Sequence, residues 1–466
     1  MPSNAPPNYF EALDYPGMIA AYPAGDDFLA MARTISGDEL FARQDAAFRK
    51  TLAFAWKVPF YRRLWGGRGI EPGDIDGLAD IGKLPTYDKS DLMASVEAHP
   101  PIGDFAGLEA YAEHERPPMV FQTTSGTTGR PQPLIFGARS REIQNLLLAR
   151  IYALQGLRRS DVVHSVYGHG MVNGGHYVRE AITHWVGAQM LTAGTGIETR
   201  SLNQVQLMRD FGATAIVGFG DYIKRLAQVA RENGIEPGRD IPVRVISGHM
   251  GADADQIRAA WGGAEIYDWY GVGDTGAIAG EGPDHDGMYV IEDAQYLELI
   301  DVDTHDPVER GALGDMVCTC LYKDDLFPII RFNTHDVTRE MEGESSIGLG
   351  FKRIAGFLGR SDNMVKLRGI NVYPQAIGAL MTAHSDALNG EYVCEVRGAE
   401  GRDEMRVLAE SAERDDALRE RLEALLRERL GVGIAVELRE PGSLSELTQI
   451  ETRQKPIRLV DKRKDG

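Results

Sequence analysis

Hydrophobic residues in the middle of the chain recur with two alternating periods. At 141–155 they return every three or four residues, with Ile143, Leu146, Leu147 and Ile151 on one face, which predicts an amphipathic helix. Short apolar runs of strand length alternate with further helical segments. The expected strands are 161–166, 188–192, 213–217, 243–246 and 265–270, and the other expected helices are 176–186, 202–211, 221–233 and 255–261. This alternation of strand and helix predicts a parallel sheet of the α/β class.

The N-terminal part of the chain has helical patterns of its own. Ser36 followed by Glu39 has the spacing of a capping box and predicts the start of a helix that ends before Pro59. The face that this helix is expected to bury consists of Phe41, Phe48, Leu52 and Ala55. A short helix is expected at 88–98 and a strand at 119–122.

The pattern changes again in the last third of the chain. From 287 to 336, apolar runs are separated by Gly, Pro and Asp turns, which is typical of an antiparallel sheet or barrel-like lobe. A boundary is expected near Gly359 to Asp362, and a small α+β domain follows it. Its expected elements are a helix from Gln375, strands at 391–396, 405–409 and 434–438, and a helix at 415–430. The chain therefore divides into 1–361 and 362–466.

Composition narrows the class of protein. A chain of 466 residues that is 43% hydrophobic can bury a large core and form more than one domain. It has 50 Lys and Arg against 69 Asp and Glu, a formal charge of -19, which argues against nucleic acid or an anionic membrane as a partner. No apolar run approaches the length of about 18 residues that spans a membrane, and the first residues lack a secretion signal. We expect a soluble cytoplasmic protein.

Three cysteines are too few for a disulfide framework in a chain of this length. Cys318 and Cys320 are expected on the same face of one strand, and Cys394 lies far from both. They are read as buried small side chains, with metal ligation as the less favoured alternative because no His or Cys pair completes a site nearby.

The densest cluster of candidate chemistry is a loop rich in hydroxyl groups at 123–131. It contains four Thr, one Ser and two Gly, followed by Arg130 and Pro131. Glycines let backbone N–H groups turn toward one point, hydroxyls add donors, and a guanidinium matches phosphate oxygens. The pattern favours phosphate binding over a plain surface turn. It is not a P-loop, because no Gly-Lys-Ser/Thr follows at the required offset.

Two further segments combine polar residues with expected strand ends. The segment 268–276 follows a strand, at the edge where open α/β sheets place ligands. An aromatic residue beside its glycines can stack on a base, and Asp274 can hold Mg²⁺ near phosphates. The segment 331–336 ends in Asp336, a carboxylate suited to ribose hydroxyls. Taken singly, each segment is as consistent with a structural turn as with a site.

Together and in this order, the segments resemble those of the adenylate-forming enzymes, and among them the phenylacetate–CoA ligases. The resemblance runs from about Ser36 to the end of the chain, and includes the hinge-like segment 359–364, the loop 368–374 and the C-terminal segment 454–463. The sequence departs from the family pattern at four motif positions: Arg130 stands where Lys is usual, Asp274 where Glu is usual, Gln454 where Gly is usual, and Gly273 where a hydroxyl residue is usual.

The resemblance implies a fold, a reaction and a set of site residues. The fold is a large N-terminal adenylation domain of parallel-sheet subdomains plus a small β-barrel-like lobe, with a smaller mobile C-terminal lid domain. The substrates and cofactors of the implied reaction are ATP, Mg²⁺, coenzyme A and an aromatic carboxylic acid. The implied phosphate-binding residues are Thr124, Ser125, Gly126, Thr127, Thr128, Gly129 and Arg130. The implied adenine- and ribose-binding residues are Gly248, His249, Asp268, Trp269, Tyr270, Gly271, Asp336 and Arg360.

The remaining implied residues concern the acid, the metal and the lid. The acyl pocket is assigned to Tyr167, His169, Gly170 and Gly273, the Mg²⁺ ligand to Asp274, the hinge and coenzyme A loop to Asp362, Arg368 and Gly369, and catalysis to Lys455. By spacing alone, Lys455 is one more solvated cation of a basic tail; the motif match favours the catalytic role. His164, His169 and His176 are either recognition groups for a polar ring substituent or satisfied core residues, and both interpretations stay open.

The sequence therefore leaves three candidate functions. The first is an ATP- and Mg²⁺-dependent ligase that joins an aryl or arylacetic acid to coenzyme A. The second passes the adenylate to another acceptor, such as an amine, a carrier-protein thiol or a small nitrogen nucleophile. The third is a non-catalytic acyl-nucleotide-binding protein. The sequence leaves the acid and the acceptor open, and a homodimer is expected only from the resemblance.

Overall fold

The computed structural model describes residues 6–124, 131–250, 254–368, 370–399, 402–449 and 456–463. The predictions for Ser125, Gly126, Thr127, Thr128, Gly129, Arg130, Gly369 and Lys455 therefore lie outside the described residues. The chain divides into two compact units. One comprises 1–249, 257–334 and 339–356, and the other 250–256, 335–338 and 357–466. Each unit is described by itself.

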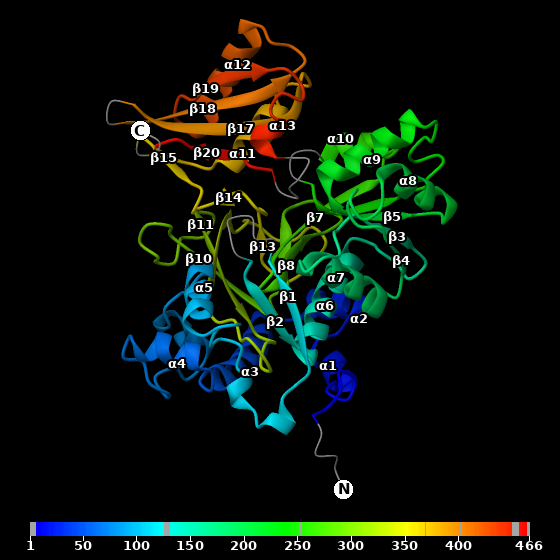
Figure 1. Ribbon diagram of the computed structural model, residues 1–466. Helices are drawn as coiled ribbons and strands as arrows, with labels where there is room; N and C mark the ends of the chain where they lie inside the picture. Colours follow the sequence, from blue (N-terminus) through cyan, green and yellow to red (C-terminus); the bar gives the residue numbers. More distant parts are fainter. Residues whose placement is uncertain are drawn as a thin grey trace. The chain divides into compact units, whose positions relative to one another are not determined.

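A mixed eight-stranded sheet forms the centre of the first unit (Figure 1). Its parallel half contains β4 (Gln189–Thr192), β3 (Val162–Ser165), β5 (Ala215–Phe219), β6 (Val245–His249) and β7 (Glu265–Val272), in that spatial order. The antiparallel half continues with β8 (Gly276–Glu281), β9 (Met288–Val290) and β13 (Arg353–Ile354). The predicted parallel α/β sheet is confirmed. The antiparallel pairing begins at β7 and β8, earlier in the chain than the turn pattern indicated.

The helices that precede and connect these strands follow the predicted order. They are α6 (Ala138–Leu154), α7 (Asn173–Glu180), the π-helical turn Ala181–Val186, α8 (Ser201–Asp210), α9 (Gly220–Glu232) and α10 (Ala254–Ala260). Helix α6 differs from the expectation because both its apolar face and its polar residues are buried. Arg141, Glu142, Gln144, Asn145 and Arg150 are each at most 1% exposed. The polar residues of α6 must therefore find partners inside the protein.

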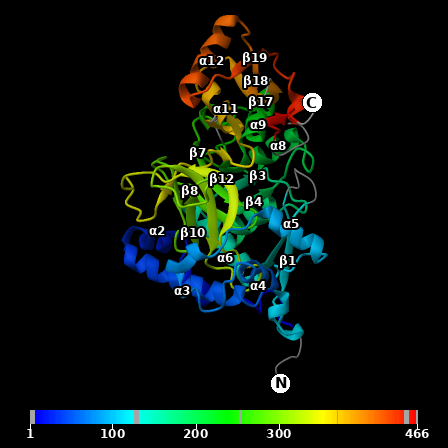
Figure 2. The same ribbon diagram turned by 90° about the vertical axis from the view of Figure 1, so that its left-hand side faces the viewer.

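The N-terminal segment adds α1 (Tyr15–Ala21), α2 (Gly25–Thr34), α3 (Gly37–Ala55), α4 (Pro59–Gly66) and α5 (Lys89–Ala98). Ser36 caps α3 as predicted, because its Oγ accepts a hydrogen bond from the backbone N–H of Glu39 at 3.2 Å. The expectation that Phe41 is buried is wrong: it is 48% exposed, and the neighbouring Leu40 faces the core instead. Gln44 donates to the carbonyl of Glu292 at 2.7 Å, which attaches α3 to the loop after β9. Helices α2, α3 and α4 can be followed in blue in Figure 2.

A second sheet contains β10 (Gln295–Ile300), β11 (Leu313–Cys320), β12 (Phe332–Arg339) and β14 (Gly359–Arg360). Strands β10 and β11 are antiparallel, as predicted for this part of the chain. Cys318 and Cys320 lie buried on β11 as free thiols, which confirms the interpretation as core side chains. Within the described ranges, no group of three or more His, Cys, Asp or Glu residues is arranged to hold a metal ion.

The C-terminal part of the second unit is an α+β domain. A four-stranded sheet has the order β19 (Ala435–Arg439), β18 (Arg402–Ser411), β17 (Leu388–Ala399) and β20 (Leu459–Asp461). The other elements are the hairpin β15 (Val365–Leu367) and β16 (Ile370–Val372), and helices α11 (Pro374–Thr382), α12 (Asp416–Leu430) and α13 (Ser445–Thr448). Leu418, Leu422 and Leu426 of α12 are fully buried in the core of this domain. The prediction of a small α+β domain is confirmed, and the exact boundary at 361/362 stays a prediction.

The search for membrane-spanning helices covered only the described residues. None of the helices in them combines the length and the apolar character needed to cross a bilayer.

Candidate active site

The hydroxyl-rich loop is carried by a β-hairpin in the first unit. Strand β1 (Met119–Thr123) pairs antiparallel with β2 (Pro133–Gly137), and the chain between them contains the loop. Its two ends are joined by two hydrogen bonds. The N–H of Thr124 donates to the carbonyl of Gln132 at 3.0 Å, and the N–H of Gln132 donates to Oγ1 of Thr124 at 3.2 Å. Thr124 thus lies at the base of the loop, where the sequence predicts it.

The carboxylate of Asp274 lies beside this loop base, on the turn that joins β7 to β8. Gln132 Nε2 donates to Asp274 Oδ1 at 2.5 Å, and Lys323 Nζ donates to the main-chain oxygen of Asp274 at 3.2 Å. The side chain of Asp274 is almost fully buried. Burial raises the pKa of Asp274 above its usual value, although the hydrogen bond from Gln132 and the charge of Lys323 oppose the shift. A further positive charge beside Asp274 would therefore stabilise the ionised form of its carboxylate.

Gly273, which precedes this carboxylate, lies in a crowded position. A Cβ on Gly273 would stand 2.9 Å from Cδ1 of Leu134 and 3.7 Å from Cγ2 of Thr124. The space that a hydroxyl side chain would need is therefore taken by Leu134. The same contacts show that the 273–275 turn packs directly against the base of the loop.

The segment 167–172, which begins with the predicted acyl-pocket residues Tyr167, His169 and Gly170, reaches the same place. The N–H of Thr123 donates to the carbonyl of Met171 at 2.8 Å, and Thr123 pairs with Val172 as a parallel bridge. His176 Nε2 donates to the carbonyl of Gly170 at 2.8 Å. The loop base, the predicted acyl wall and the Asp274 turn therefore meet within one unit.

Four aromatic rings stand at the carboxyl ends of the parallel strands. Phe219 ends β5, His249 ends β6, Trp269 lies on β7 and Tyr167 follows β3. The centroid distances are 4.8 Å between His249 and Trp269, 5.3 Å between Phe219 and His249, and 5.2 Å between Tyr167 and Phe219. Tyr167 and Trp269 are buried and His249 is partly exposed. A wall of this kind suits a flat apolar or aromatic group.

The three histidines noted in the sequence do not form one cluster. The rings of His169 and His176 are 5.7 Å apart, and His169 Nε2 is buried without a hydrogen-bond partner among the described residues. His164 instead pairs with Gln204, whose Oε1 lies 2.8 Å from His164 Nε2. The amide nitrogen of Gln204 donates to backbone carbonyls, so its oxygen faces His164 and the proton resides on His164 Nε2. Burial lowers the pKa of His164 to about 4, and it is a neutral core residue.

The predicted nucleotide-binding residues of the first unit lie on β6 and β7. Asp268, Trp269, Tyr270 and Gly271 are part of β7 itself, which runs two residues beyond the expected strand 265–270. The hydroxyl of Tyr270 donates to Oγ1 of Thr334 at 3.3 Å. A Cβ on Gly248 would stand 1.9 Å from the carbonyl oxygen of Gly218, so close packing of β5 on β6 already explains this glycine.

The other predicted ribose and hinge residues belong to the second unit. Arg360 on β14 lies opposite Asp336 on β12, and its Nη1 donates to Asp336 Oδ1 at 2.8 Å. The same guanidinium makes two bonds to Asp362, at 2.8 and 2.5 Å. Arg360 therefore joins the predicted ribose ligand to the predicted hinge residue. Arg368 adopts a φ of 53° at the turn of the β15–β16 hairpin, next to Gly369.

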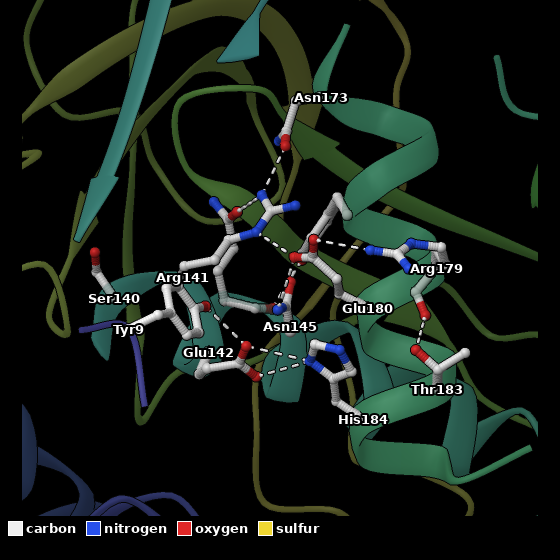
Figure 3. Close-up of polar contacts among 12 residues, drawn as sticks. Tyr9, Ser140, Arg141, Glu142, Asn145, Asn173, Arg179, Glu180, Thr183 and His184 are labelled. Atoms are coloured by element: carbon white, nitrogen blue, oxygen red, sulfur yellow. Dashed lines mark hydrogen bonds and ion pairs between the residues drawn. The ribbon is translucent and has the colours of Figure 1, made fainter. Parts of the chain in front are cut away.

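Sequence reasoning missed a buried polar cluster that supports the acyl wall (Figure 3). Arg141 Nε donates to Glu180 Oε2 at 2.6 Å, and its Nη1 donates at 2.6 Å to Oδ1 of Asn173, the first residue of α7. On the next position of α6, Glu142 accepts hydrogen bonds from Tyr9, His184 and Trp185. Gln132, Lys323 and Phe219 were also missed. Only Gln132 gave a signal, through its position two residues after Arg130.

Comparison with known proteins places this arrangement among characterised enzymes. Residues 369–463 match the family of AMP-binding enzyme C-terminal domains. The phenylacetate–coenzyme A ligase of Pseudomonas putida is 32% identical over 359 residues, which is 74% of this chain and 76% of the relative. That of Thermus thermophilus is 28% identical over 440 residues, 88% of this chain and 94% of the relative.

Among solved structures, 2-hydroxyisobutyryl-CoA ligase in its postadenylation state, in complex with 2-HIB-AMP, superposes with a TM-score of 0.78. Its sequence is 26% identical, over 94% of this chain and 92% of that one. The same ligase with 2-HIB-AMP and CoA in the thioesterification state gives a TM-score of 0.66 at 28% identity, over 93% of this chain and 92% of that one.

The fold and these comparisons define an adenylate-forming enzyme, with a large N-terminal domain and an AMP-binding C-terminal domain. Within that superfamily the chain belongs to the phenylacetate–CoA ligase family. It is thus an acyl-CoA ligase that acts through an acyl-adenylate.

Proposed function

We propose that this enzyme activates an aromatic carboxylic acid with ATP and Mg²⁺ and then transfers the acyl group to coenzyme A. The observation that carries the proposal is the wall of Tyr167, Phe219, His249 and Trp269, which belongs to the same unit as the loop base and Asp274. An aromatic ring against this wall would bring its carboxylate toward a bound triphosphate. The named relatives that act on phenylacetate support the same choice of substrate class.

In the first step a carboxylate oxygen attacks the α-phosphorus of ATP, and the bond to the β-phosphate breaks to release pyrophosphate. This step is limited mainly by positioning and by neutralisation of charge. We assign the triphosphate to the loop 124–130, and the ribose to Asp336 with Arg360. Lys455 bridges the acid and the α-phosphate.

The residues around Asp274 fit a magnesium ion. Mg²⁺ prefers oxygen ligands and is bound through one or two carboxylates plus substrate phosphates. Asp274 supplies a carboxylate, and Gln132 Oε1 is a buried acceptor without a partner among the described residues. When bound, the ion would neutralise charge that develops on the departing pyrophosphate. Aspartate is one methylene shorter than the usual glutamate, so an ion must approach closer or bind through water.

In the second step the thiol of coenzyme A attacks the acyl carbon, AMP leaves, and the thiol proton passes to solvent or a base. We assign this step to a rotation of the small domain about Asp362, which withdraws Lys455 and brings in the loop at Arg368 and Gly369. The ion pair between Arg360 and Asp362 supports a polar joint at this position.

We further propose that the acid carries a polar ring substituent. His169 Nε2, buried and without a partner among the described residues, is the group that favours this proposal. His176 keeps its own bond to Gly170 and is left to support the wall. If changes at Tyr167 and His169 left the preference among ring-substituted acids untouched, this refinement would be wrong.

The deciding experiment measures pyrophosphate release over a panel of aryl acids, each with and without coenzyme A. A rise in turnover with coenzyme A, together with a thioester product, supports the ligase and identifies the ring. Turnover that ignores coenzyme A would leave adenylation and redirect the search to another acceptor. No pyrophosphate with any acid of the panel would contradict the proposal that the substrate is an aromatic acid. Light scattering tests the expected homodimer separately.

A further inference from the structure

The 273–275 turn is held by buried side chains from distant parts of the first unit. Besides Lys323, the hydroxyl of Tyr322 donates to the carbonyl of Thr275 at 2.8 Å, and Gln295 Nε2 donates to the same carbonyl at 2.9 Å. Tyr322, Lys323 and Gln295 are at most 1% exposed. These groups fix the backbone of the turn, and none of their bonds is made to the carboxylate of Asp274.

Gln132 is different because it touches both the carboxylate and the loop. Its side-chain nitrogen donates to Asp274 Oδ1 at 2.5 Å, and its backbone makes the two bonds that close the loop base at Thr124. The side chain is fully buried. Since a carboxylate only accepts hydrogen bonds, the nitrogen must face Asp274 and the oxygen must face away from Oδ1. Gln132 Oε1 is then the buried acceptor without a partner among the described residues.

We propose that Gln132 is a positioning residue that couples the triphosphate loop to the metal-binding carboxylate. One oxygen of Asp274 is engaged by the amide, which fixes the plane of the carboxylate and the direction of the other oxygen. The amide oxygen offers an acceptor for a water molecule of the magnesium shell. A single residue thus sets the distance between the group that holds phosphate and the group that holds the ion.

This inference rests on the proposed function, because it assumes that Asp274 binds Mg²⁺ together with ATP. It predicts that loss of the Gln132 amide weakens Mg²⁺ binding, whereas loss of a buried amide that only stabilises the fold does not. Outer-sphere partners of metal ligands typically change metal affinity by about 10- to 100-fold. We therefore expect Gln132→Met to raise the Mg²⁺ concentration that gives half of the full ATP-induced thermal shift by at least about tenfold.

Gln295→Met is the matched control. Gln132 and Gln295 are both fully buried glutamines that hold the same turn. The amide nitrogen of Gln295 donates only to backbone carbonyls, and its oxygen accepts from the thiol of Cys318 at 3.3 Å, so Gln295 makes no bond to a carboxylate. Both replacements remove a buried amide and keep an unbranched side chain of similar size, so both lower the thermal midpoint. Only Gln132→Met should raise the Mg²⁺ concentration at the midpoint of the titration. Gln132→Asn keeps an amide but retracts it by one methylene, and serves if Gln132→Met does not fold.

The first measurement is the thermal shift produced by ATP as Mg²⁺ is titrated, which requires no turnover. The second is pyrophosphate release over the same Mg²⁺ range. A higher Mg²⁺ midpoint in Gln132→Met or Gln132→Asn, with a wild-type midpoint in Gln295→Met, supports the proposal. Equal midpoints in all variants, or equal increases at both glutamines, would overturn it. A wild-type protein whose ATP-induced shift ignores Mg²⁺ would instead refute the metal role of Asp274, and with it the underlying function.

Discussion

Two buried arginines on one helix allow a sharp test of how the acyl wall is supported. Arg141 and Arg150 are both fully buried on α6, each pairs with a carboxylate, and each lies against aromatic rings. Arg141 reaches Asn173, which follows the acyl-wall segment directly. Arg150 instead contacts Asp293 after β9 and the carbonyl of Pro23. We predict that Arg141→Lys and Arg150→Lys differ in function although they resemble each other in stability.

The expected loss of stability follows from the bonds that lysine cannot keep. Lysine retains the charge but not the planar fork, so each variant loses at least one charge-assisted hydrogen bond, worth about 1.5–3 kcal/mol. Weaker contact with the rings adds roughly 0.5–1 kcal/mol. We therefore expect each variant to lose about 2–4 kcal/mol of unfolding free energy. Denaturant unfolding followed by tryptophan fluorescence measures this loss.

The functional readout separates the two variants. A displaced acyl wall misplaces the acid, and small misplacements of reacting groups cost roughly 10- to 100-fold in rate. We expect Arg141→Lys to lose about tenfold or more in kcat/KM for the acid and to keep its KM for ATP. Arg150→Lys should keep both parameters within about twofold at a temperature where it is folded. An unchanged kcat/KM in Arg141→Lys, or an equal loss in Arg150→Lys, would refute the assigned support.

Three further outcomes are expected. Lys455→Ala should lower acid-dependent pyrophosphate release by roughly 10²–10³-fold yet still convert a supplied acyl-adenylate to thioester; loss of both half-reactions would contradict its role. Gly273→Ser should cost about 1–3 kcal/mol in denaturant unfolding, and Leu134→Val in the same chain should recover part of it; a cost that Leu134→Val does not reduce would contradict the crowding argument. The hydrogen bond that His184 donates to Glu142 raises the pKa of His184. Burial raises the pKa of Glu142, but its hydrogen-bond partners lower that pKa by more, so the net shift is downward. Their pairing therefore stabilises the fold above the usual glutamate pKa and fades as pH rises through the raised histidine pKa. The stability deficit of Glu142→Gln should then shrink as pH rises past neutrality, and a deficit that stays flat to about pH 9 would contradict this sign.

Local signals accounted for most of the fold. The cap at Ser36, the strand–helix alternation and the burial of Cys318 and Cys320 depend on neighbours in sequence, and each was predicted correctly. Phe41 failed because the buried arc of α3 is set by what packs on it, and Leu40 is the residue that faces the core. The buried charges of α6 were unpredictable for the same reason. A polar residue at a helical position reads as solvent-exposed until its partner, often far away in the chain, is known.

The candidate site shows the same difference between residues that are close in sequence and partners that are distant. Family motifs indicated Asp274, Asp336 and the hydroxyl-rich loop as candidates, because motif residues are close together in sequence. Lys323 supports Asp274 from 49 residues away, and no local pattern indicates it. Gln132 lies 142 residues from Asp274, and its place two residues after Arg130 did not indicate this contact. Their role became visible only from distances between side chains.

Helix α6 also limits how this enzyme can change its choice of acid. Arg141 and Arg150 stand nine residues apart, about 13 Å along the axis, and each is anchored to a different part of the first unit. A helix held at two such points can neither shift along its axis nor rotate without breaking the hydrogen bonds of one of these arginines. Attempts to accept larger acids are therefore best directed at the 167–172 segment and Phe219, while α6 is kept as the fixed reference against which a remodelled pocket is built.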